Sequence, residues 1–172
     1  MVDPILKWAG GKRQLLADIT ALFPVTYQAY HEPFVGGGAV FFHLDPDVGT
    51  INDLNERLTT FYEVVRDYPD QLIAENKTHE YAEEYFYQAR EKFNRALSQS
   101  TVTREGRIQE ASLLLYLNRT CFNGLYRENS DGESTSRLAG TQIQTGCRNN
   151  GSARRPVAYR GRMCSTRILT MC

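Results

Sequence analysis

The sequence predicts an α/β fold that begins with part of a parallel sheet and continues into a block of helices. Residues 30–66 read in the order strand, glycine turn, helix, strand and helix, which is the order that builds a parallel sheet. Residues 69–118 then carry helical patterns. From residue 134 onward no hydrophobic period is recognisable, so we expect residues 134–172 to form a largely disordered tail.

The first predicted helix follows the glycine turn in KWAGGKRQLLADITALF. Its apolar side chains fall on one face, which is typical of a helix that packs against a core. These side chains are Leu15, Leu16, Ile19 and Leu22. Pro24 is expected to end the helix, because proline cannot continue the backbone hydrogen bonds.

Two strands with a glycine turn between them follow. YHEPFVGGGAVFFHL reads as a strand, the turn Gly36–Gly38 and a helix, and GTINDLNERL as a second strand ending at Asp53. Asn55 suits the N-cap of a helix that runs through Val65. In a Rossmann-like sheet a nucleotide-like ligand lies across the carboxyl ends of the strands. The glycines would let the backbone approach it, and Asp53 would accept hydrogen bonds from its ribose.

The helical block comprises PDQLIAENKTHEYAEEYFYQAREKFNRAL and REGRIQEASLLLYLNR, the second with a strong apolar stripe. Glycine and asparagine end it at NRTCFNGLYRENSDGE, where residues 129–132 predict a hairpin turn. No lysine follows the glycine triplet at P-loop spacing, which argues against an NTPase.

Charge is distributed unevenly along the chain. Residues 134–172 hold seven arginines and no acidic residue, so the net charge is −7 before Ser134 and +7 from there on. Such asymmetry indicates either a tail that binds nucleic acid or a segment with a separate history. Three of the four cysteines lie in this tail without CxxC spacing, so we expect no zinc site. Without a secretory signal or a long apolar run, we expect a cytoplasmic protein that is not in a membrane.

Four motifs in order resemble those of the Dam-type (D12 class) DNA adenine-N6 methyltransferases. They are LKWAGGKRQLL, HEPFVGGGAVFF, INDLNERL and LLLYLNRTCFNGLYRENSDGE, and the resemblance covers roughly residues 5–133. It implies a partial Rossmann-like methyltransferase sheet with an inserted helical DNA-recognition module and hairpin. The expected boundaries are 1–66 for the N-terminal part of the cofactor-binding domain, 67–133 for the recognition insert and 134–172 for the tail.

The resemblance also implies ligands and their residues. The cofactor would be S-adenosylmethionine, and the partner of the monomeric protein would be double-stranded DNA at a GATC-like site. The cofactor-binding residues would be Trp8, Lys12, Glu32, Pro33, Phe34, Gly36, Gly37, Gly38 and Asp53. The DNA-binding residues would be Arg119, Phe122, Asn123, Leu125 and Arg127.

Plainer roles remain open for several of these residues. Trp8 could pack the N-terminus onto the core, Phe122 and Leu125 could pack the hairpin, and Arg127 could be a solvated strand residue. With the resemblance we favour DNA contact. An aromatic wedge would offset part of the few kcal/mol needed to unstack the target adenine. An arginine can read guanine through two hydrogen bonds.

The chain lacks the Asp-Pro-Pro-Tyr quartet that carries catalysis in this family. After the NSDGE stretch, similar proteins continue Phe-Asn-Val-Pro-Phe-Gly-Arg-Tyr-Lys-Asn-Pro. Synonymous codons can be chosen for residues 134–144 so that one base added in front of them gives Phe-Asn-Val-Pro-Phe-Gly-Arg-Tyr-Thr-Asn-Pro. We therefore expect a one-base deletion after Glu133, an out-of-frame tail, and no catalytic residues or methylation from this chain.

Two other functions stay open at this point. One is a non-catalytic DNA- or S-adenosylmethionine-binding fragment or regulator, whose basic tail would bind phosphates in a salt-sensitive manner. The other is a Rossmann-like methyltransferase for small molecules, against which the NRTCFNGLYR stretch argues.

Overall fold

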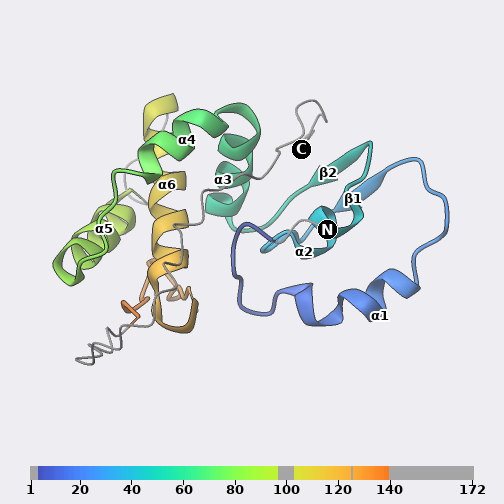
Figure 1. The fold of residues 1–172 in the computed structure, drawn as a ribbon, viewed down its shortest axis with the longest axis horizontal. Helices are drawn as coiled ribbons and strands as arrows, with labels where there is room; N and C mark the ends of the chain where they lie inside the picture. Colours follow the sequence, from blue (N-terminus) through green and yellow to red (C-terminus); the bar gives the residue numbers. More distant parts are fainter. Residues whose placement is uncertain (1–3, 97–102, 125, 140–172) are drawn as a thin grey trace, which may run out of the picture.

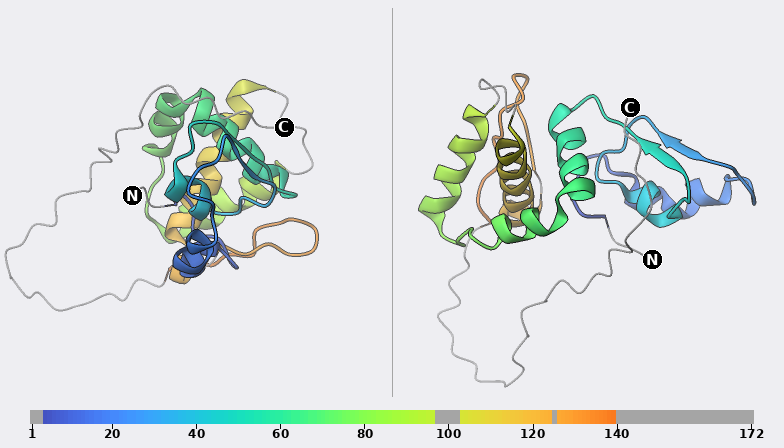
Figure 2. Two further views of the ribbon diagram at one scale, coloured as in Figure 1. Left: turned by 90° about the vertical axis from the view of Figure 1, so that its right-hand side faces the viewer. Right: turned by 90° about the horizontal axis from the view of Figure 1, so that it is seen from above.

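The computed structural model describes residues 4–96, 103–124 and 126–139, and Figure 1 shows their arrangement. A small sheet with helices α1 and α2 forms one side of the molecule, and helices α4, α5 and α6 form the other. Helix α3 stands between the two sides, as the view from above also shows (Figure 2). The architecture is a helix-rich mixture of α and β structure with a parallel sheet, which agrees with the α/β class expected from the sequence.

The sheet consists of β1 (Tyr30–Glu32) and β2 (Gly49–Ile51). The strands run parallel and pair Tyr30 with Gly49, His31 with Thr50 and Glu32 with Ile51. Helix α2 (Ala39–Leu44) lies in the connection between them. The predicted order of strand, glycine turn, helix and strand is therefore confirmed, and both strands end at the edge where the glycine turn begins.

The first predicted helix is present, but its apolar face is only partly buried. It forms as a 3₁₀ turn, η1 (Lys12–Leu15), followed by α1 (Leu16–Ala21). Leu15 is 54% exposed and Leu22 is 86% exposed. The apolar face is therefore divided: Leu15 and Leu22 are exposed, whereas Leu16 and Ile19 are half-buried.

Helices α3 to α6 follow the sheet along the described chain. Helix α3 (Glu56–Asp67) begins at Asn55, whose side chain accepts a hydrogen bond from the backbone N–H of Arg57 (3.0 Å), as the sequence predicts. Helices α4 (Pro69–Asn76), α5 (Glu83–Arg95) and α6 (Arg104–Thr120) follow. Helix α6 packs against α3, α4 and α5, so the apolar stripe read in the sequence forms the centre of this half.

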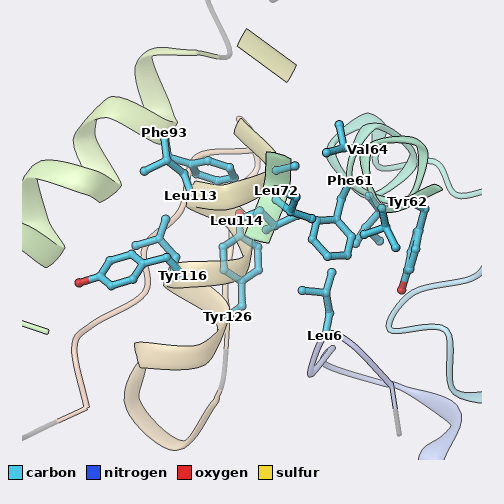
Figure 3. Packing of buried hydrophobic residues seen from close by; sticks show 14 of the residues in the cluster. Leu6, Phe61, Tyr62, Val64, Leu72, Phe93, Leu113, Leu114, Tyr116 and Tyr126 are labelled. Carbon is cyan, nitrogen blue, oxygen red and sulfur yellow. The ribbon is translucent and has the colours of Figure 1, made fainter. Parts of the chain in front are cut away.

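The core runs from the helical half toward the N-terminal segment (Figure 3). Its largest buried side chains come from α3, α5, α6 and the hairpin segment, and Leu6 joins them from the N-terminal side. They include Leu6, Phe61, Tyr62, Phe86, Phe93, Leu114, Leu117 and Tyr126. Because Leu6 belongs to the same cluster, the N-terminal segment is packed onto the helical half as well as onto the sheet.

Order continues past the boundary that the sequence suggested. The hairpin turn is present: the N–H of Asn129 donates to the carbonyl of Glu133 (2.9 Å). Ser134 and Ser136 are buried, and Asn94 of α5 bonds both the N–H (2.7 Å) and the carbonyl (3.1 Å) of Ser134. The prediction that disorder begins at residue 134 is therefore wrong for residues 134–139. Hydrogen bonds to their backbone groups hold these residues in place, and such bonds do not require particular side chains. The rest of the predicted tail, 140–172, lies outside the described residues.

No helix in the described ranges combines the length and apolar character that a membrane crossing requires.

Candidate functional site

The glycine turn and Asp53 meet at the carboxyl ends of the two strands. One carboxylate oxygen of Asp53 accepts a hydrogen bond from the backbone N–H of Gly36 (2.9 Å). The other accepts one from the backbone N–H of Asn55 (3.1 Å). The turn that follows β1 and the residue that follows β2 are thus joined directly. Each carboxylate oxygen keeps lone-pair capacity for a further donor.

The turn leaves no room for larger residues. A Cβ atom on Gly37 would lie 2.6 Å from the backbone oxygen of Leu6, so only glycine allows the two segments to approach this closely. Gly38 caps helix α2 with a φ of 78°, a left-handed conformation that favours glycine. From α3, the Tyr62 hydroxyl donates to the carbonyl of Gly36 (2.9 Å). Burial, followed by the nearby carboxylates, raises the pKa of Tyr62, so its hydroxyl stays protonated as a donor.

Lys12 and Glu32 support the turn from its other side. The Lys12 ammonium donates to Glu32 Oε1 (2.8 Å) and to the carbonyl of Phe34. Glu32 is 4% exposed, and its second oxygen is buried and accepts no hydrogen bond among the described groups. Pro33 and Phe34 lie exposed beside it. The structure therefore brings Lys12, Glu32 and Phe34 together, and the lysine donates to a backbone carbonyl next to the turn.

Trp8 lies between the glycine turn and the hairpin. A Cβ atom on Gly36 would lie 3.3 Å from Trp8 Cδ1, and the indole stacks on the Tyr126 ring with centroids 5.5 Å apart. Trp8 is half-buried, so both proposed roles of the sequence analysis keep a structural basis: the ring packs the N-terminus and also borders the turn. All nine residues expected to bind the cofactor lie in three neighbouring segments, 8–12, 32–38 and 53.

A buried asparagine that the sequence analysis missed fixes the segment that carries Trp8. Asn118 of α6 is fully buried, accepts a hydrogen bond from the Lys7 N–H (2.9 Å) and donates one to the Lys7 carbonyl (2.7 Å). These two bonds mimic a strand partner and hold the N-terminal segment against α6. An asparagine on the apolar stripe of a helix was the only sequence signal for this contact.

The residues expected to contact DNA occupy the end of α6 and the loop that follows. Phe122 is 56% exposed, and Asn123 adopts a left-handed φ of 55° within η2 (Phe122–Gly124). The Arg119 side chain donates to the carbonyl of Ile5 and is otherwise exposed. Arg127 is exposed, with its backbone N–H bonded to the Ser136 hydroxyl (3.0 Å). Leu125 lies outside the described residues.

Two hairpin residues that the sequence analysis did not single out contact the site. Tyr126 is buried and donates its hydroxyl to Glu128 Oε1 (2.8 Å). Glu128 Oε2 accepts a hydrogen bond from the Asn55 side-chain amide (2.8 Å). The hairpin thus contacts both Trp8 and the cap of α3. In the part of the chain that is described, no three His, Cys, Asp or Glu side chains gather as they would around a metal ion.

Comparison with known proteins identifies one family. The family model described as D12 class N6 adenine-specific DNA methyltransferase matches residues 8–141. A type II methyltransferase of Lactococcus lactis subsp. cremoris is 39% identical over 132 residues, which is 76% of this chain and 45% of the relative. A type II methyltransferase of Methanocaldococcus jannaschii is 37% identical over 150 residues, 77% of this chain and 50% of the relative.

A DNA adenine methylase of Escherichia coli K12 is 37% identical over 132 residues, 74% of this chain and 44% of the relative. The chain therefore spans about half the length of the curated relatives it matches. The family match runs from residue 8 to residue 141 and so extends past Glu133.

Proposed function

Because this chain belongs to the D12 class of N6 adenine-specific DNA methyltransferases, we propose that it binds S-adenosylmethionine and double-stranded DNA. The observation that carries the proposal is the meeting of Asp53, the glycine turn and Trp8 at the carboxyl ends of two parallel strands. Ligands of α/β sheets bind in this position. S-adenosylmethionine supplies the methyl group that the class transfers to adenine N6.

The residues at this site suit S-adenosylmethionine. Asp53 would accept hydrogen bonds from the ribose hydroxyls with its remaining lone pairs. The glycine turn, which no Cβ atom obstructs, would let backbone approach the methionine part beside Glu32, Pro33 and Phe34. Lys12 would act through the turn, because its ammonium is bonded to Glu32 and to the Phe34 carbonyl. Trp8 would offer an aromatic edge to the ligand.

For DNA, we propose the loop and hairpin after α6 as the contact surface. Phe122 would wedge into the duplex, since its ring is exposed on a loop that two left-handed residues, Asn123 and Gly124, turn sharply. Arg127 would read a base edge, with roughly 1–3 kcal/mol of discrimination. Asn123, Leu125 and Arg119 would complete the contacts at a GATC-like site.

This assignment divides the chain into parts with separate roles. Residues 1–66 would be the N-terminal part of a Rossmann-like cofactor domain, and 67–133 the recognition module with its hairpin. Residues 134–139 continue that hairpin. A DNA substrate also agrees with the cytoplasmic location expected from the sequence.

We further propose that this chain binds both ligands without methylating DNA. The Asp-Pro-Pro-Tyr quartet does not occur in its 172 residues, so no such quartet holds the adenine amine for attack. A one-base deletion after the codon of Glu133 remains our explanation. Resequencing the source DNA across codons 128–146 tests it: an additional T after Glu133 would restore the family's reading frame.

Calorimetric titration of the purified chain with S-adenosylmethionine tests the cofactor site. We expect saturable binding, and Asp53→Asn should weaken it about tenfold or more, because hydrogen bonds to a charged group contribute roughly 1.5–3 kcal/mol. Asparagine keeps an oxygen for the Gly36 N–H, so the turn should persist, although the Asn55 N–H loses its acceptor. Asp70→Asn, which removes an exposed carboxylate from α4, is the matched control and should bind as the parent does.

DNA binding and turnover are measured separately. Fluorescence anisotropy with a duplex that contains GATC, and with one that lacks it, should show tighter binding to the first. Tritium transfer from labelled S-adenosylmethionine to the duplex should not exceed the DNA-free background. Transfer above that background would contradict the absence of turnover, and a parent chain that binds no S-adenosylmethionine would contradict the cofactor site.

A further inference from the structure

The hairpin is hydrogen-bonded to the cap of α3 in addition to being closed by its own turn. The Glu128 carboxylate accepts a hydrogen bond from the Asn55 side-chain amide (2.8 Å) and another from the Tyr126 hydroxyl (2.8 Å). Asn55 in turn donates its backbone N–H to Asp53 (3.1 Å). A single residue, Asn55, therefore separates the carboxylate at the cofactor site from the carboxylate on the hairpin.

A second contact joins the same two regions. Trp8, whose ring would lie 3.3 Å from a Cβ atom on Gly36, stacks on Tyr126 of the hairpin at an interplanar angle of 27°. Tyr126 is 4% exposed, and burial, followed by the nearby Glu128 carboxylate, raises its pKa. The Tyr126 hydroxyl therefore stays protonated as a donor. The hairpin is held at two points to residues that border the cofactor site.

We propose that Glu128 is a positioning residue that couples the cofactor site to the DNA hairpin. It would touch neither ligand. A ligand that fixes Asp53 and Trp8 also fixes Asn55 and Tyr126, and with them the hairpin that presents Phe122 and Arg127. Binding of S-adenosylmethionine then favours the hairpin orientation that binds DNA, and the reverse must hold to the same extent. This inference rests on the proposed function, because it needs both ligands to bind.

A merely structural brace and a coupling residue differ in a measurable quantity. Loss of a residue that only stabilises the hairpin weakens DNA binding by the same factor whether or not the cofactor is present. Loss of a coupling residue changes the ratio of the DNA affinity measured with S-adenosylmethionine to the DNA affinity measured without it. The decisive readout is therefore the factor by which saturating S-adenosylmethionine tightens binding of the duplex, called here the linkage factor.

The linkage factor is measured by anisotropy with a labelled duplex containing GATC, in the presence and absence of S-adenosylmethionine. A ligand at one linked site typically changes the affinity at the other by about 5- to 150-fold. We expect the linkage factor of the parent chain to fall in that range. Glu128→Ala should lower the factor several-fold toward one, while the Trp8–Tyr126 stacking retains the rest of the coupling. Glu128→Gln, which keeps one acceptor oxygen, should give an intermediate value and guards against a variant that fails to fold.

Glu133→Ala is the matched control. It removes the same charge from the same hairpin, but Glu133 is exposed and its carboxylate bonds only to its hairpin neighbour Asn129 among the described side chains (3.0 Å). Its linkage factor should equal that of the parent. Emission from Trp8, the single tryptophan, checks in every variant that the indole keeps its stacked environment.

The outcomes separate the inference from the proposed function. A parent chain that binds both ligands with a linkage factor of one overturns the inference and leaves the proposed function intact. A Glu128→Ala chain with the parent's linkage factor overturns it as well. If the parent binds neither S-adenosylmethionine nor the duplex, the proposed function falls, and the inference falls with it.

Discussion

Ser134 and Ser136 occupy positions that favour apolar side chains. Residues 134–137 alternate between buried and exposed, as in a strand that turns one face to a core, and the buried members are the two serines. The Ser136 hydroxyl accepts the Arg127 N–H, but the Ser134 hydroxyl is buried without a hydrogen-bond partner in the described structure. The frame proposed to precede the deletion would place Phe and Val at these two positions, which is the pattern that an inward-facing strand prefers.

Replacing Ser134 by alanine should therefore stabilise the chain. The substitution removes an unpaired buried hydroxyl, so we expect the free energy of unfolding to rise by about 1 kcal/mol. Urea unfolding followed by circular dichroism measures this change. Thr135→Ala, at the exposed neighbour, should stay within about 0.5 kcal/mol of the parent. A loss of stability in Ser134→Ala would mean that the hydroxyl has a partner after all.

His79 should make stability depend on pH in the mildly acidic range. Its ring contacts the Tyr85 hydroxyl (2.7 Å) and the Ser112 hydroxyl (2.9 Å). Burial lowers the pKa of His79, with Lys92 adding to the effect and Glu75 opposing it. The folded chain thus favours the neutral ring, and protonation favours the unfolded chain. Stability from this group is complete above the unfolded pKa of about 6.5 and is lost as the pH falls from there through the lower folded pKa.

Unfolding free energies at pH 7.5 and 5.5 test this prediction. The parent should lose more stability between the two pH values than His79→Gln, whose amide cannot take up the proton. Equal losses in the two chains would assign the pH dependence to other groups.

At the scale of elements, the sequence predicted the features that depend on interactions between neighbouring residues. The two strands, the glycine turn and the cap of α3 at Asn55 all depend on residues within a few positions, and the sequence indicated each of them. The contacts that assemble these elements do not have a local signal. Asn118 bonds Lys7 across 111 positions, and Glu128 bonds Asn55 across 73. The partial exposure of the first helix has the same origin, because an apolar stripe tells which side of a helix is apolar but not whether a partner covers it.

Arg57 makes contacts of this long-range kind and joins α3 to both α5 and α6. From α3, its guanidinium donates to the carbonyl of Phe93 (2.7 Å), lies 3.6 Å from the centroid of the Phe93 ring, and pairs with Glu110 of α6 (3.3 Å). Arg57 and Glu110 are both buried. Breaking such a pair leaves a buried charge, so Arg57→Met should cost about 3–5 kcal/mol.

A double-mutant cycle separates the pair from its surroundings. The double variant Arg57→Met with Glu110→Leu should lose less stability than the two single variants combined, because it leaves neither charge unpaired. Urea unfolding of the four chains gives the coupling. Additive losses would show that the two side chains contribute independently.

At the scale of the whole molecule, burial is concentrated in the helical half. The buried core draws mainly on α3, α5, α6 and the hairpin, whereas η1 and α1 contribute no buried residue. On the sheet side, several apolar side chains stay exposed, namely Leu22 (86%), Val25 (101%), Val48 (57%) and Leu54 (86%). A two-stranded sheet is marginal in water unless other elements cover it. The two halves should therefore differ in local stability.

Hydrogen exchange measured by mass spectrometry tests this difference. Peptides from residues 30–51, which hold both strands, should exchange through local opening, well before peptides from 108–117 in the buried part of α6. S-adenosylmethionine should slow exchange in 30–51 selectively, because a ligand held at Asp53 and the glycine turn stabilises only the states in which these segments are closed. Peptides from α6 already open mainly by global unfolding, so their protection should rise only with global stability. Equal exchange in the two regions without ligand would mean that the small sheet unfolds together with the helices, as one cooperative unit joined through Leu6, Asn118 and the hairpin.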